Sequence, residues 1–129
     1  MEAAQPVVYI VDDDVSVRRA LTRLMRSVGL EAVAFASAEA FLQVGLPQQQ
    51  CCLVLDVRLT GMTGLNLLGH LTAAGVSLPV ILITAHDDTQ VHARASSAGV
   101  IAYLRKPFDD EALLAAIQRA FGRAPGSPS

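Results

Sequence analysis

Strand-like and helix-like patterns alternate five times along this chain, and few folds are compatible with that alternation. Four of the strand-like segments, VVYIV, CLVL, PVILI and IAYL, are continuous apolar runs, which is typical of strands buried on both faces of a sheet. Between them, apolar residues such as Val17, Leu21 and Leu24 recur in steps of three and four, the spacing of one helix face. Repeated strand–helix units predict an α/β fold: a doubly wound, five-stranded parallel sheet with right-handed crossovers.

Turn and capping residues set the expected bounds. Gly29 and Gly99 are expected to end helices, and Ser37 and Asp109 to cap helix starts. Strands are predicted at residues 7–11, 31–35, 52–55, 79–83 and 101–104. Helices are predicted at residues 15–28, 37–42, 64–74, 89–97 and 109–121. We interpret residues 1–122 as one domain and residues 123–129, RAPGSPS, as a linker-like tail.

Composition argues against several classes of protein. The formal charge of -2 disfavours direct nucleic-acid binding by this segment, because neutralising phosphates requires a basic patch. No apolar run approaches the ~20 residues that span a bilayer, and the start MEAAQP does not resemble a signal peptide. Cys51 and Cys52 are neighbours on a strand and point to opposite faces, so we expect two free, buried thiols. Free thiols predict a cytoplasmic protein.

Polar residues follow four of the five predicted strands. They are Asp12, Asp13 and Asp14 after the first strand, Asp56 after the third, Thr84 after the fourth, and Arg105, Lys106 and Pro107 after the fifth. The second strand ends in apolar residues and contributes none. Ligands of open parallel sheets bind just outside the carboxyl ends of the strands, so these side chains are expected to share one site.

The types of residue in this set indicate phosphoryl chemistry. Crowded carboxylates repel one another, and a hard divalent cation such as Mg²⁺ would relieve that repulsion. A carboxylate is also a nucleophile that can form an aspartyl phosphate. Lys106 would neutralise a phosphoryl group from the other side, and the Thr84 hydroxyl could donate to a phosphoryl oxygen.

Four motifs in this chain resemble those of bacterial response-regulator receiver domains. They are VDDD, DVRLTGMTG, ITAH and AYLRKPF, each at a strand end, and the match runs over about residues 7–121. The segments SAEAFL, TAH and RKPF resemble those of the FixJ-like branch, whose members usually carry a DNA-binding helix-turn-helix after the receiver. The resemblance implies a CheY-like, flavodoxin-like sheet with strand order 2-1-3-4-5. The second strand is then an outer strand, which agrees with its lack of a polar end.

The resemblance also implies a role for each acidic residue. Asp56 would be the phospho-acceptor. Asp13 would bind Mg²⁺ directly, Asp12 chiefly through water, and the backbone carbonyl of Arg58 would be a further ligand. Independently of the resemblance, Asp14 is interpreted as structural, with either Asp14 or Ser16 as the N-cap of the first helix.

Further roles are implied beyond the metal ligands. Lys106 would pair with the phosphoryl group, and the Lys106–Pro107 peptide bond would be cis. Thr84 and Tyr103 would act as the switch, with Thr84 turning toward the phosphoryl oxygens and Tyr103 moving inward. One departure is Thr60, where the family usually has proline. Because proline stiffens a loop, Thr60 is expected to make this loop more mobile and to alter metal affinity or the switch.

Several functions remain open at this point. The favoured one is a receiver that a histidine kinase phosphorylates, that dimerises through the fourth helix and fifth strand, and that controls a transcriptional output absent from this chain. It would catalyse only its own phosphorylation and dephosphorylation. The alternatives are a stand-alone regulator, a pseudo-receiver, a flavodoxin-like cofactor binder, and a haloacid-dehalogenase-type phosphatase. That phosphatase class requires Asp-x-Asp, where this chain reads Asp56-Val57-Arg58. His86 could meet attacking water or be uninvolved, and His70 and His92 are expected on the surface.

Overall fold

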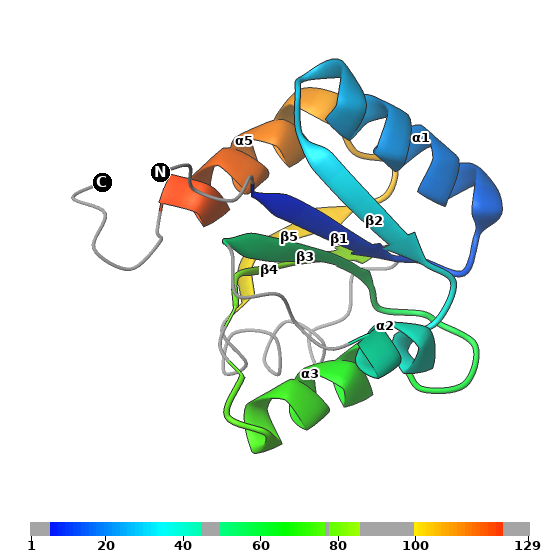
Figure 1. Cartoon of the computed structure of the whole chain (residues 1–129). Helices are drawn as coiled ribbons and strands as arrows, with labels where there is room; N and C mark the ends of the chain where they lie inside the picture. Colours follow the sequence, from blue (N-terminus) through cyan, green and yellow to red (C-terminus); the bar gives the residue numbers. More distant parts are fainter. Residues whose placement is uncertain (1–5, 45–49, 77, 86–99, 123–129) are drawn as a thin grey trace.

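The computed structural model describes residues 6–44, 50–76, 78–85 and 100–122 of the 129-residue chain (Figure 1). The elements are β1 (Val7–Val11), α1 (Val15–Ser27), β2 (Glu31–Phe35), α2 (Ala38–Val44), β3 (Cys51–Asp56), α3 (Gly64–Ala73), β4 (Val80–Thr84), β5 (Val100–Arg105) and α5 (Asp110–Gly122). The predicted helix at 89–97, with His86 and His92, lies outside the described residues. Among the helices described, none combines the length and apolar character that crossing a membrane requires.

All five strands are parallel and pair in the order β2-β1-β3-β4-β5, which confirms the predicted fold class and order. Val11, at the end of β1, lies opposite Phe35 of β2 on one side and Leu55 of β3 on the other. The chain therefore leaves β1 toward β2 and returns to the far side of β1 at β3. A reversal of this kind opens a crevice at the carboxyl ends of the two central strands.

Two hydrophobic layers hold the sheet between pairs of helices. In Figure 1, α1 and α5 lie on one face of the sheet and α2 and α3 on the other. Side chains of β1 alternate between the layers: Val8 and Ile10 pack with α1 and α5, whereas Tyr9 and Val11 pack with α2 and α3. The central strands β1, β3 and β4 are buried on both faces, as their unbroken apolar runs predict.

Some local expectations need correction. β3 is one residue longer at each end than predicted, so Asp56 belongs to the strand, and β4 is shifted by one residue to end at Thr84. β5 is half-buried rather than buried, because it is an edge strand of the sheet. Cys51 is likewise half-buried, although Cys52 is buried as expected. Ala20 and Val28 lie four positions before and after Leu24, a spacing that predicts the same apolar face, but both are exposed.

Candidate functional site

Two adjacent strand ends bring three carboxylates together. Asp12 and Asp13 follow β1, and Asp56 is the last residue of β3. One oxygen from each carboxylate lies within 4.8 Å of the other two. Asp12 and Asp56 are only 2% and 7% exposed, whereas Asp13 faces solvent. Clustered carboxylate oxygens with access to water fit a hard divalent cation such as Mg²⁺, which retains several waters in protein sites.

Neighbouring segments on several sides hold Asp12 in place. Its backbone N–H donates to the carbonyl of Phe35 at 3.1 Å, and its own carbonyl accepts from Nη1 of Arg18 at 2.7 Å. Its carboxylate Oδ1 accepts from the backbone N–H of Asp14 at 2.9 Å. Asp14 in turn caps α1 by accepting from the N–H of Ser16 at 2.8 Å, which confirms its structural interpretation. Asp12 is thereby tied to both β2 and α1.

Lys106 lies between the two buried carboxylates. Its Nζ is 3.4 Å from Oδ2 of Asp12 and 3.4 Å from Oδ2 of Asp56. Its backbone N–H donates to the carbonyl of Thr84 at 2.7 Å, so the segment after β5 is joined to the end of β4. The peptide bond from Lys106 to Pro107 is cis, the isomer that the resemblance implies.

The site carries more negative than positive charge. Burial raises the pKa of Asp56, and the charge of Asp12 adds to this, against the opposing effects of Lys106 and of a 3.1 Å hydrogen bond from the Arg58 N–H. Burial alone would lower the pKa of Lys106, but the two carboxylates outweigh it and the pKa is raised. Both pKa values are therefore raised, that of Asp56 mainly by burial and that of Lys106 by the two carboxylates beside it. A divalent cation would correct that imbalance.

Thr84 and Tyr103 lie on adjacent strands at different distances from the sheet edge. Thr84 ends β4, is 2% exposed, and follows Ile83, the register partner of Asp56. Tyr103 is half-buried in β5 opposite Leu82, two positions before the strand end, and packs against the layer under α2 and α3. The sheet therefore places Thr84 at the same edge as the acidic cluster, and Tyr103 behind it.

The loop between β3 and α3 supplies contacts that sequence reasoning missed. Thr60 donates from its backbone N–H and its hydroxyl to Oδ2 of Asp13, at 3.2 and 3.1 Å. Glu39 of α2 accepts from the N–H of Met62 at 3.1 Å. The sequence identified Thr60 as a departure from the family pattern, although not its contact with Asp13. Nothing in the sequence indicates the role of Glu39, because its partner is a backbone group.

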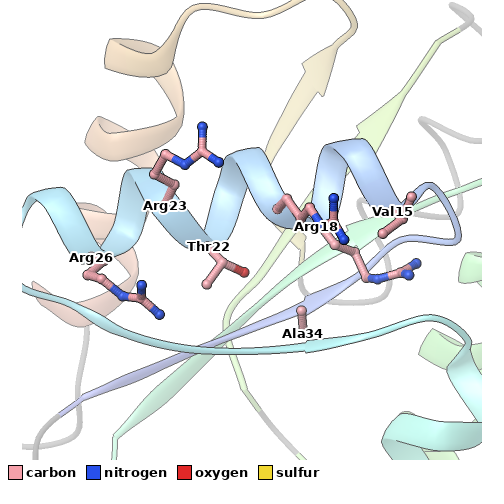
Figure 2. Close-up of a pocket in the computed structure, with 7 residues that line it drawn as sticks. Val15, Arg18, Thr22, Arg23, Arg26 and Ala34 are labelled. Carbon is pink, nitrogen blue, oxygen red and sulfur yellow. The ribbon is translucent and has the colours of Figure 1, made fainter.

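A groove with a volume of about 370 Å³ lies between α1 and the edge strand β2 (Figure 2). It is lined by Val15, Arg18, Arg19, Thr22, Arg23, Arg26 and Ala34. Within the described part of the chain, none of these arginines pairs with a carboxylate, although Arg18 reaches the backbone of Asp12. This helix is therefore strongly basic on a chain of formal charge -2, and none of the three clustered aspartates lines its groove.

Comparison with known proteins matches most of this chain to one protein family. Residues 8–118 match the family model described as the response regulator receiver domain. Nodulation protein W of Bradyrhizobium diazoefficiens is 46% identical over 121 residues, which cover 94% of this chain and 53% of that protein. The transcriptional regulatory protein FixJ of Azorhizobium caulinodans is 42% identical, covering 91% of this chain and 56% of that protein. The chain thus spans about half the length of these relatives.

A solved structure agrees with both the sequence matches and the fold. The crystal structure of the fragment FixJ-N superposes with a TM-score of 0.84 at 34% identity, covering 93% of this chain and 96% of that one.

Proposed function

This chain belongs to the response-regulator receiver family, and on that premise we propose that Asp56 accepts a phosphoryl group from a histidine kinase. One observation carries the proposal. Asp56 is buried at a strand end with Lys106 Nζ at 3.4 Å, and its carboxylate lies within 4.8 Å of those of Asp12 and Asp13. This arrangement combines a carboxylate nucleophile, a fixed cation and a metal-binding cluster in one crevice.

The proposed transfer is a single displacement at phosphorus. A carboxylate oxygen of Asp56 forms a bond to the phosphorus of the kinase phosphohistidine, the P–N bond breaks, and its electron pair stays on the imidazole nitrogen. Phosphoryl transfer depends mainly on positioning and charge neutralisation. Lys106 already lies beside the acceptor oxygen and would neutralise a phosphoryl oxygen as it arrives.

Mg²⁺ is the cofactor that this donor set fits. We assign Asp13 and Asp56 as direct ligands, Asp12 as a ligand mainly through water, and the backbone carbonyl of Arg58 as a further ligand. When bound, Mg²⁺ would neutralise charge on the phosphoryl oxygens. The Arg58 side chain is exposed, and its backbone N–H already orients Oδ1 of Asp56.

Phosphorylation would change the conformation of the surface that contacts a partner. In this proposal the Thr84 hydroxyl donates to a phosphoryl oxygen, and Tyr103 moves further into the site. The surface that reads the change would include β5 and the predicted helix at 89–97, and would mediate a homodimer. Sedimentation with and without beryllofluoride tests this, and a monomer under both conditions would count against the dimer.

We place the output outside this chain. Residues 1–122 would form the receiver and residues 123–129 a link to a DNA-binding domain, since the FixJ relative, named as a transcriptional regulator, extends well beyond the matched part. The receiver itself would make no direct nucleic-acid contact and would work in the cytoplasm. It would catalyse only its own phosphorylation and dephosphorylation. A stand-alone regulator that acts by protein contact is the alternative, and the reading frame beyond Ser129 would decide.

Acetyl phosphate with Mg²⁺ provides the direct test of the acceptor. Mass spectrometry should show a gain of one phosphoryl group on the wild-type protein and none on the Asp56→Asn variant. Asp14→Asn is the matched control, because an asparagine at this exposed N-cap retains the cap and leaves the acceptor in place. Undiminished phosphorylation of Asp56→Asn would overturn the acceptor assignment. Steady phosphate release from a small phosphomonoester would favour the phosphatase alternative instead.

A further inference from the structure

We propose that Thr60 is a positioning residue that holds Asp13 ready to bind the metal, an inference that rests on the proposed Mg²⁺ site. The backbone N–H and the hydroxyl of Thr60 both donate to Oδ2 of Asp13, at 3.2 and 3.1 Å. The two residues are 47 positions apart and come from different strand ends. Thr60 therefore joins the loop after β3 directly to the segment after β1.

Asp13 needs such support more than the other two carboxylates. Asp12 and Asp56 are buried and share Lys106, whereas Asp13 is exposed. Among the described residues, the hydrogen bonds to the Asp13 carboxylate all come from Thr60. Without them, this side chain would rotate freely in solvent, and a metal would have to order it on binding.

The geometry leaves room for the metal on the same carboxylate. A carboxylate offers about four lone-pair sites on its two oxygens. Both contacts from Thr60 go to Oδ2, so Oδ1 of Asp13 has no protein hydrogen bond within the described residues. Thr60 can thus fix the orientation of Asp13 while Oδ1 remains available as a ligand. Ligating carboxylates are commonly oriented by hydrogen bonds of this kind.

Thr60 is itself held by its loop. The next peptide turns at Gly61, which has a φ of +83°, and the N–H of Met62 donates to Oε2 of Glu39 at 3.1 Å. The loop is therefore anchored on both sides, to Asp13 by Thr60 and to α2 by Glu39. Proline, which the resemblance leads one to expect at this position, has neither an N–H nor a hydroxyl and could make neither bond to Asp13. This chain ties the loop to a metal ligand instead.

A graded set of substitutions tests the proposal through Mg²⁺ affinity measured by calorimetry. Thr60→Ser keeps both donors and should bind Mg²⁺ as the wild type does. Thr60→Val keeps only the N–H and should bind more weakly, and Thr60→Pro loses both and should be weakest. Freeing one side chain predicts a loss of roughly two- to tenfold in affinity. Thr72→Val, at an exposed position of α3 away from the site, is the control and should have no effect.

The outcomes separate this inference from the proposed function. Failure of the wild type to bind Mg²⁺ would remove the metal site and the inference together. If the wild type binds and Asp13→Asn weakens binding, but Thr60→Val and Thr60→Pro bind as the wild type does, the positioning role is wrong and the metal site stands. Tighter binding by Thr60→Val would also overturn the inference, since the hydroxyl would then be competing with the metal. Thr60→Val and Thr60→Ser decide the matter even if Thr60→Pro fails to fold.

Discussion

Gly64 lies directly against the backbone of Asp56: a Cβ built on Gly64 would be 2.5 Å from the Asp56 carbonyl oxygen and 2.9 Å from Cα of Val57. Both obstacles are backbone atoms, which cannot rotate away. The N–H of Gly64 also donates to the carbonyl of Val57 at 3.0 Å. The first residue of α3 is thus packed onto the strand end that carries Asp56, the proposed acceptor, and any side chain there would push the two apart.

Gly64→Ala should therefore destabilise the protein, by about 1–3 kcal/mol, the usual cost of forcing atoms into a packed site. Gly69 provides the control in the same helix, because a Cβ there would meet nothing within 4 Å. Gly69→Ala should raise stability by about 0.5–1 kcal/mol, since alanine favours helix interiors over glycine. Urea unfolding of the three proteins measures both effects. Equal midpoints for the two variants would contradict the close packing at Gly64.

The raised pKa of Asp56 predicts how stability depends on pH. Burial is the main cause, so the folded protein binds this proton more tightly than the unfolded chain, whose pKa is near 3.8. Stability contributed by Asp56 is then lost as pH rises from about that value through the raised folded pKa. Without metal, Asp56→Asn should be more stable than the wild type near neutral pH. The gap should shrink as the pH falls toward 4, as measured by urea unfolding at several pH values.

Mg²⁺ provides the check on that interpretation. Binding beside Asp56 should stabilise the wild type and reduce the advantage of Asp56→Asn at neutral pH. If Asp56→Asn is instead the less stable protein at neutral pH without metal, the contact with Lys106 outweighs the cost of burying the carboxylate.

The two cysteines should differ in reactivity. Burial raises the pKa of Cys52 to about 12, so almost none of it is thiolate at pH 8, and its side chain is inaccessible. In the Cys51→Ser variant, a disulfide reagent such as dithionitrobenzoate should not modify the native protein and should modify one thiol in urea. Cys52→Ala leaves only the half-buried Cys51, which should react slowly in the native state. Rapid native labelling of Cys51→Ser would contradict the burial of Cys52.

Repulsion between the arginines of α1 should lower the free energy of unfolding of the protein. Arg19 and Arg23 are four positions apart on one helix, where like charges repel. Arg19→Glu replaces that repulsion with a pair whose acidic member is N-terminal, the better orientation, and should stabilise the protein by about 0.5 kcal/mol. The gain should diminish in high salt. Arg19→Gln, the neutral control, should fall between the two in urea unfolding, and a loss of stability in Arg19→Glu would indicate that Arg19 has a structural partner.

The local hydrophobic pattern and the order of the segments along the chain were sufficient to predict much of the fold of this protein. Apolar runs long enough only for strands, separated by helical spacing, indicate a parallel sheet with helices on both faces, because strands apolar on both sides must be covered on both sides. The carboxyl ends of parallel strands share an edge, so the grouping of Asp12, Asp56 and Lys106 also follows from their positions in the chain. The strand order rested on the resemblance, since several doubly wound orders suit the same pattern.

Tertiary structure decided the contacts that involve backbone groups or loop geometry. Whether Thr60 loosens its loop or ties it to Asp13 depends on where two separate loops meet, and no local propensity specifies that. The close contact of Gly64 with Asp56 and the hydrogen bond from a backbone N–H to Glu39 also could not be predicted from the sequence. Every residue has a backbone, so the sequence does not indicate which backbone group a side chain will contact. The polar residues that meet at this edge of the sheet could thus be identified from sequence. Which neighbours position them is a property of the folded chain, because it depends on distances between segments that are far apart in sequence.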